Sequence, residues 1–313
     1  MAVDIGASSL LGLCREAAIG TWLTPEYYIP ILSEDLAVVQ SNIYRRPIRG
    51  LVDPVGAVPG PTHVEGSITF EVTDTNLPYI LYGMRGAVVQ TGTGDLTYTF
   101  TPSAIGIPVA GRTLSFTLER NAIVFAYVGC VVGSLSITMQ NGIMVATVGI
   151  VGQSEAVQAA PTEVWPTTIP TGIPGDMKVE IPTSTQVYDA DTFTLEINDN
   201  AEAVFRLEDA DRSARFVKFG DRDVTLTVER DFENRTEFDL FKAATAQAIT
   251  ISAIQSATRL IQFDIESAIH DSYAVPLSAT SDLVRAQIDY RGVYNATDTR
   301  SYLIVVKTDE DLS

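Results

Sequence analysis

Ser134-Leu-Ser-Ile-Thr-Met139 and Ile143-Met-Val-Ala-Thr-Val-Gly-Ile150 flank the tripeptide Gln140-Asn-Gly142. In the first segment apolar and polar residues alternate, as in a strand that buries one face. Asn-Gly supplies the two positive φ angles of a type I′ turn at little steric cost. The stretch therefore predicts a β-hairpin.

Four further segments alternate strictly, and each combines an apolar face with a face of hydroxyl groups and one glutamate. They are Ile68–Val72, Leu114–Glu119, Phe193–Ile197 and Val224–Glu229. The alternation predicts half-buried strands, so the fold class is mainly β.

One helix is expected over about 235–246. Asn234 and Glu237 form a capping box there, and an apolar stripe follows them. A shorter helix is expected from Leu10 to Ala18. The mainly β fold is thus predicted to carry one or two short helices.

Composition excludes several classes of protein. The chain has 313 residues, and 39 acidic against 21 basic side chains give a formal charge of −18. A chain of this length predicts about two domains, and 46% apolar residues exclude wholesale disorder. The acidity argues against binding to DNA phosphates or to anionic lipid. No secretory signal or membrane span is recognised, and Cys14 and Cys130 are expected to be reduced.

The order of strands repeats in the two halves of the chain, which indicates an internal duplication. The matches are 68–74 with 193–199, 115–120 with 225–230, 135–138 with 249–252 and 145–150 with 260–265. A proline-rich stretch between the halves is predicted to be a linker. The predicted domains are an N-terminal arm over 1–60, a first unit over 61–158 with a long loop at 83–111, the linker over 159–178 and a second unit over 179–313.

No catalytic constellation emerges. His63 and His270 lack partners at metal-ligand spacing, and no GxSxG, Walker or GxGxxG motif occurs. The acidic doublets lack the further ligands of an EF-hand, so solvated loops are expected, with a weak Ca²⁺ site as the alternative. These doublets are Asp189/Asp191, Asp209/Asp211 and Asp221/Asp223. The sequence predicts no enzyme activity, cofactor or metal, and an acid-pair glycoside hydrolase is the enzymatic alternative.

A succession of loose motifs covers residues 20–156. In order they are Gly20-Thr-Trp-Leu-Thr-Pro-Glu-Tyr-Tyr-Ile-Pro-Ile31, Asn42-Ile-Tyr-Arg-Arg-Pro-Ile-Arg-Gly50, Val64-Glu-Gly-Ser-Ile-Thr-Phe-Glu71, Tyr79-Ile-Leu-Tyr-Gly83 and Tyr127-Val-Gly-Cys-Val-Val-Gly-Ser-Leu-Ser136. This succession resembles the major tail tube proteins of long-tailed, non-contractile bacteriophages. The resemblance implies β-sandwich subunits in stacked rings, whose inner sheets join into a barrel around a channel for DNA.

For this chain the resemblance implies two tandem tail-tube-like β-sandwich or half-barrel units that assemble into a β-barrel-lined ring and deliver phage DNA. Two units per chain favour a trimer with pseudo-sixfold symmetry over a hexamer in which one unit lines the channel. The implied partners are further copies, the tape measure protein and tube-end proteins, with DNA only in transit and no membrane. The implied location is the virion, after synthesis in the host bacterial cytoplasm. The alternative is another virion or surface β-sandwich module, such as a tail-tip, capsid decoration or adhesin-like protein.

Two sets of residues are expected to make the contacts of such a tube. Candidates for contacts between subunits or rings, which alternatively cover the chain's own sandwich, are Trp22, Tyr27, Tyr28, Tyr44, Arg45, Arg46 and Arg49. Candidates for lining the channel are Glu71, Glu119, Glu196 and Glu229, because a negative wall offers DNA no binding by counterion release. The alternative is that these glutamates face outside solvent or pair with Arg120 and Arg230.

Overall fold

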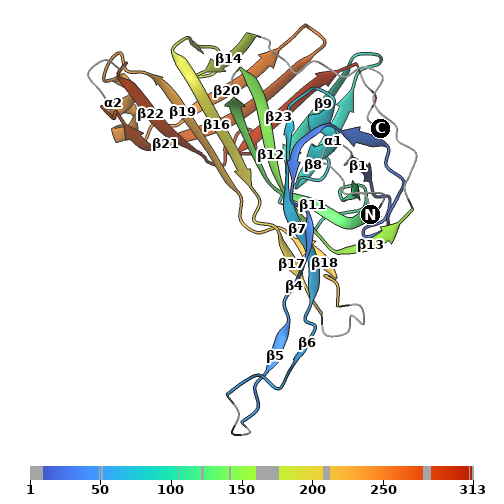
Figure 1. Cartoon of the computed structure of the whole chain (residues 1–313). Helices are drawn as coiled ribbons and strands as arrows, with labels where there is room; N and C mark the ends of the chain where they lie inside the picture. Colours follow the sequence, from blue (N-terminus) through green and yellow to red (C-terminus); the bar gives the residue numbers. More distant parts are fainter. Residues whose placement is uncertain are drawn as a thin grey trace.

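The predicted hairpin is present, because β11 (Ile123–Gln140) and β12 (Ile143–Gly152) pair from Val131↔Val151 to Gln140↔Ile143. The structure is a computed structural model that describes residues 10–48, 50, 52–104, 106–120, 123–140, 142–159, 176–206, 212–277, 283–309 and 311. The described chain is mainly β, with two short helices, and its sheets pack as a β-sandwich (Figure 1). The predicted fold class is confirmed.

One sheet, called the long sheet below, runs through both halves of the chain. Its order is β3 (Ile31–Glu34) with β4 (Ala37–Gln40), then β7 (Thr62–Glu71), β12, β11, β16 (Ala190–Asn198), β19 (Asp223–Asp231), β22 (Arg285–Gly292) and the second half of β21 (Leu260–Ala274). All neighbours are antiparallel, and β3 and β4 follow one another along the same edge of β7. The halves of the chain meet where Ser136 of β11 lies opposite Glu196 of β16.

A second sheet packs against the long sheet. Its order is β15 (Gln186–Val187), β14 (Asp176–Glu180), β20 (Gln247–Ile254), the first half of β21, β23 (Tyr302–Thr308), β9 (Leu96–Pro102) and β8 (Gly86–Thr91). Strand β21 belongs to both sheets, since its first half pairs with β20 and β23 and its second half with β22. Apolar side chains of both sheets, such as Phe70, Leu195, Phe263 and Ile304, form one core.

A third, smaller sheet contains the first half of β11. Its order is β2 (Tyr27–Ile29), β1 (Leu10–Arg15), β10 (Leu114–Arg120), β11 and β13 (Ser154–Gln158). The helix expected from Leu10 to Ala18 is therefore wrong. Its apolar run Leu-Leu-Gly-Leu-Cys is continuous, and such a run fits a fully buried strand as well as a helix. Pairing with both β10 and β2 decides the outcome.

The helix expected over 235–246 is present as α2 (Thr236–Ala243). The Oδ1 atom of Asn234 accepts a hydrogen bond from the Thr236 N–H at 2.8 Å, as a capping residue does. The Glu237 side chain does not close a capping box, because it contacts Arg230 and His270 instead. The second helix, α1 (Asn76–Leu81), was not predicted and is wholly buried.

Two hairpins extend from one end of the sandwich. β5 (Ile43–Arg45) pairs with β6 (Gly56–Val58) in the longer hairpin, which projects far from the body (Figure 1). We call residues 41–60 the arm. The predicted N-terminal arm over 1–60 is thus shorter than expected, because β1 to β4 within residues 10–40 pair in the sheets of the body. The shorter hairpin pairs β17 (Glu202–Val204) with β18 (Phe216–Lys218) near the base of the arm. Helix α2 lies at the opposite end of the sandwich (Figure 1).

The two halves of the predicted duplication differ in how their matched strands pair. β7 pairs with β12, whereas its sequence match β16 pairs with β19. β11 and β12, by contrast, pair with each other as their matches β20 and β21 do. The matched strands thus agree in one pairing and differ in another, and the division into two units stays a prediction. Residues 160–175, most of the predicted linker, lie outside the described part of the chain.

Candidate functional site: the polar face of the long sheet

Hydroxyl and charged side chains cover one face of the long sheet, which we call the polar face. Side chains directly opposite one another in antiparallel strands lie on the same face of a sheet. One such row crosses six strands and consists of Thr69, Thr147, Ser136, Glu196, Thr225 and Arg291. The residues between them along each strand, such as Phe70, Leu195 and Leu226, point into the core.

Three of the four predicted channel glutamates share the polar face. Glu71 follows Thr69 on β7, Glu196 lies between Ser136 and Thr225, and Glu229 lies opposite Gln287 on β22. Glu119 lies apart from them, because β10 belongs to the third sheet and sets Glu119 opposite Leu10 and Val124. The structure thus brings together Glu71, Glu196 and Glu229 but not Glu119.

The polar face carries more carboxylates than cations. Among the described residues, Glu71 and Glu196 are exposed and have no ion-pair partner, while Glu229 lies 3.5 Å from Arg285. The arginines that follow Glu119 and Glu229 bind elsewhere. Arg120 donates to Glu34 at 2.8 Å, and Arg230 donates to Asp189 at 3.0 Å. Within the chain, these arginines therefore do not neutralise the glutamates beside them.

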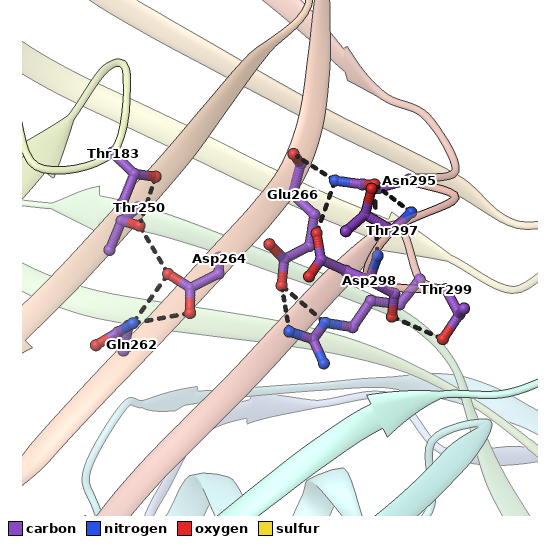
Figure 2. A network of polar contacts seen from close by, with 10 residues as sticks. Thr183, Thr250, Gln262, Asp264, Glu266, Asn295, Thr297, Asp298 and Thr299 are labelled. Atoms are coloured by element: carbon purple, nitrogen blue, oxygen red, sulfur yellow. Dashed lines mark hydrogen bonds and ion pairs between the residues drawn. The ribbon is translucent and has the colours of Figure 1, made fainter.

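The outer face of the second sheet differs, since its acids are engaged in hydrogen bonds within the chain. Figure 2 shows Asp264, whose oxygens accept hydrogen bonds from the Thr250 hydroxyl at 2.7 Å and the Gln262 amide at 2.8 Å. Glu266 Oε1 accepts from Arg300 Nε at 2.7 Å. Unpaired acids are thus a property of the polar face rather than of every surface of the sandwich.

The arm presents apolar and basic side chains to solvent. Tyr44, Arg45 and Arg46 are exposed on it, together with Ile48 (105% exposed) and Val52 (91% exposed). Arg49 lies outside the described residues. A hairpin that exposes aliphatic side chains so fully buries little apolar surface within its own chain.

The other predicted contact residues contribute to the chain's own packing. Trp22 Nε1 donates a hydrogen bond to Thr117 Oγ1 at 3.1 Å. Tyr27 is buried, stacks on Tyr79 at 4.4 Å between ring centroids and donates its hydroxyl to Asn76, and Tyr28 is buried as well. For Tyr27 and Tyr28 the structure matches the alternative expectation, in which aromatic residues cover the chain's own sandwich.

Sequence reasoning missed three buried carboxylates. Asp199 pairs with Arg222 at 2.7 Å, Asp74 lies 3.7 Å from Arg259, and Glu16 accepts hydrogen bonds from the N–H groups of Gly129 and Gly20. Burial raises the pKa of the Glu16 and Asp74 carboxyls. No local motif predicts that these carboxylates are buried, because the partners of Asp74 and Glu16 come mostly from distant parts of the sequence.

The two histidines contact glutamates, and several acids of the doublets contact arginines, all within the same chain. His63 lies 3.3 Å from Glu65, and His270 is buried 3.1 Å from Glu237. Among the doublets, Asp189, Asp191 and Asp223 are ion-paired with arginines, and Asp209 and Asp211 lie outside the described residues. Across the described ranges, no cluster of three or more His, Cys, Asp or Glu side chains is arranged to hold a metal ion. Neither described helix has the length and apolar character needed to cross a membrane.

Comparison with known proteins adds one positive finding. The sequence profile of a family described as phage tail tube protein matches residues 6–292, which is nearly the whole chain. A search of curated proteins gives no match. The matched range includes every strand of the long sheet, and so it includes the polar face and the arm.

Proposed function

This chain belongs to the phage tail tube protein family, and we propose that it self-assembles into stacked rings that form the hollow tube through which phage DNA is delivered. The family is one of structural virion proteins of the bacteriophage tail. The observation that carries the proposal is the long sheet, which joins both halves of the chain and has one polar face and one buried face. A tube wall needs such a surface, with its inner side wetted and its outer side covered.

The long sheet favours a trimeric ring. Strands of both halves continue one another through β11 and β16, so both halves would line the same channel. Eight strand positions per copy, at a spacing of about 4.8 Å and a tilt of roughly 40°, give a wall about 50 Å across for three copies and about twice that for six. The narrower ring, formed by three copies, leaves a channel that suits a DNA duplex, which is roughly 20 Å thick. A hexamer lined by one half of each chain would divide the long sheet between two environments.

The charge of the polar face supports passage of DNA without binding. Glu71 and Glu196 are exposed and unpaired among the described residues, and Asp223, Glu229 and Asp289 lie on the same face. Proteins hold DNA chiefly by exchanging condensed counterions for Lys and Arg contacts. A channel lined by this face offers few such contacts, so DNA would pass through it without being bound.

The arm is the proposed contact between successive rings. It leaves the sandwich at the end opposite α2, and its exposed side chains Tyr44, Arg45 and Arg46 accompany fully exposed aliphatic residues. Aromatic and arginine side chains are the usual anchors of protein interfaces. Packing of the arm against the next ring would bury this surface. The tape measure protein and tube-end proteins are the further partners proposed for the finished tail.

Electron microscopy of the purified full-length protein tests the proposal. We expect rings at low concentration and stacked hollow tubes as the concentration rises. A protein that stays monomeric, or forms only a closed trimer without stacking at any concentration, would contradict the tube and favour another virion module, such as a tail-tip or capsid decoration protein.

A further inference from the structure

The long sheet ends in two unlike edges, and both are open. At one end, β3 and β4 pair with β7 along one edge only. At the other end, residues 269–274 of β21 pair with β22, and β20 on the opposite edge of β21 reaches only as far as Ala268. In the part of the chain that the structure describes, no strand covers the outer edge of β3–β4 or the outer edge of residues 269–274.

Helix α2 lies beside the second half of β21 but does not extend the sheet. It contacts the strand on its core side, where His270 Nε2 is 3.1 Å from Glu237 Oε2 and the Tyr273 ring meets Phe238 edge-on. His270 and Tyr273 lie opposite the buried residues Tyr290 and Ile288 of β22. The helix therefore supports the strand from the core and adds no further strand to it.

Neither open edge carries Lys or Pro, two residues that blunt natural edge strands, within residues 31–40 or 269–274. A β-bulge interrupts β3 between Ile31 and Ser33 and β21 between His270 and Ser272, whereas β4 has neither a bulge nor a charged side chain. Exposed apolar side chains lie at both edges instead, with Leu32 of β3 57% exposed and Leu277, just beyond β21, 79% exposed. Edges of this kind associate with another strand.

The strand directions allow the two edges to join one another. All neighbours along the eight positions of the long sheet are antiparallel, so β3–β4 at one end and β21 at the other run in opposite directions. Rotation about the axis of a ring keeps the direction of every strand, so β21 of one copy would meet β3–β4 of the next as an antiparallel pair. An odd number of positions would have set two parallel strands at this joint. The even number lets the alternation continue from copy to copy.

We propose that the β3–β4 edge of one copy pairs head-to-tail with residues 269–274 of the next copy, and that this joint closes the long sheet into a ring. The inference rests on the proposed tube function and adds which edges meet. Because the joined edges are unlike, the contact is heterologous and builds a ring, whereas like-to-like pairing would stop at a dimer.

Hydrogen exchange tests the joint without changing the sequence. We expect backbone amides of residues 37–40 and 269–274 to exchange at least tenfold more slowly in assembled tubes than in the dilute subunit, because roughly half of them gain a partner. Amides of β12, which are paired on both edges within the chain, serve as the control and keep their protection. Unchanged exchange at both edges in well-formed tubes would overturn the inference.

Crosslinking then tests which edges meet. Val39→Cys and Ser272→Cys place one thiol on each edge, and both positions lie on the polar face, opposite His63 and Asp289. The native thiols do not compete, because Cys14 and Cys130 are buried. A bismaleimide longer than a disulfide tolerates a register shift of a residue or two. Val39→Cys with Thr147→Cys is the matched control, since Thr147 lies in the middle of the long sheet.

The double variant is expected to crosslink into dimers and closed trimers, while each single variant and the control pair stay monomeric on a denaturing gel. A ladder that runs to six would still support the edge pairing and would correct the ring size. Dimers from either single variant would show like-to-like pairing and overturn the inference, as would tubes of the double variant that crosslink no more than the control. A wild-type protein that never assembles would instead contradict the proposed function itself.

Discussion

Asp199 Oδ1 accepts a hydrogen bond from Arg222 Nε at 2.7 Å inside the protein, where the Asp199 side chain is fully buried. Arg222 also donates to the main-chain oxygens of Arg85 and Ser103 at 3.3 Å, and the Arg85 guanidinium lies 4.0 Å from Asp199. Arg85 and Ser103 flank the hairpin of β8 and β9, which occupies much of the stretch 83–111 predicted as a long loop. One buried carboxylate therefore ties that hairpin to the second half of the chain.

Replacement of Asp199 should destabilise the subunit strongly. Asp199→Ala leaves two largely buried guanidinium groups, those of Arg85 and Arg222, without their carboxylate. Breaking a buried pair in this way costs about 3–5 kcal/mol. Asp223→Ala is the control, because the Asp223–Arg291 pair is half exposed and such surface pairs are worth about 0–1 kcal/mol. Urea unfolding of the dilute subunit at pH 7 measures both. Equal losses in the two variants would show that the buried network contributes no more than a surface pair.

Glu16 should make stability depend on pH. Its oxygens accept hydrogen bonds from the Gly129 N–H, the Gly20 N–H and the Thr113 hydroxyl at 2.7–2.8 Å, and burial raises its pKa above the ordinary value of 4.5. The folded protein therefore binds the proton more tightly than the unfolded chain. The contribution of Glu16 to stability is then largest below its ordinary pKa and falls as the pH rises through the raised pKa of the folded state.

The Glu16→Gln variant tests this sign. It lacks the titration, and its amide faces an N–H donor at a cost of about 1–3 kcal/mol. We expect the gap in unfolding free energy between wild type and Glu16→Gln to narrow as the pH is raised from about 4.5 to 8, as read from urea midpoints. Glu71→Gln, at an exposed position, controls for the loss of a carboxylate. A gap that widens instead would mean that the three hydrogen bonds outweigh burial and lower the pKa.

A cation on the polar face should make the tube retain DNA. In Glu196→Arg tubes each ring presents its arginines to the channel, and we expect binding of double-stranded DNA at least tenfold tighter than wild type at low salt, with the difference lost as salt is raised. Glu119→Arg is the matched control, because Glu119 lies on the third sheet. A gel-shift or sedimentation assay over a salt series measures the effect. Equal retention by both variants would place Glu196 outside the channel.

Loss of the apolar tip of the arm should uncouple stacking from ring formation. Ile48→Ser with Val52→Ser removes two fully exposed side chains, so the stability of the subunit should change by less than about 0.5 kcal/mol. We expect single rings but few tubes in negative-stain micrographs. Val89→Ser, at another exposed position on β8, should leave tube length unchanged. Tubes of normal length in the arm variant would show that the rings stack through other contacts.

Much of the strand content follows from local pattern, because alternation and the Asn-Gly turn act within a few residues. The strands at 68–72, 114–119, 193–197 and 224–229 and the helix α2 all lie where the pattern predicts them. The local pattern from Leu10 to Arg15 did not distinguish a strand from a helix. Its pairing with β10, about a hundred residues away, and with β2 makes it a strand. Likewise, the buried state of Tyr27 depends on Tyr79 and Asn76, which approach it only in the folded chain.

The sequence by itself determined that this protein is mainly β, acidic and without a recognisable catalytic motif, because composition and short-range periodicity are properties of neighbouring residues. Tertiary structure decided which strands share a sheet, and therefore which side chains lie together on one face. It placed Glu71, Glu196 and Glu229 on one sheet and Glu119 on another, and it joined the two halves through β11 and β16. The reason is physical: strand pairing is non-local, so the same alternating segment can occupy any sheet until its hydrogen-bonding neighbours are chosen.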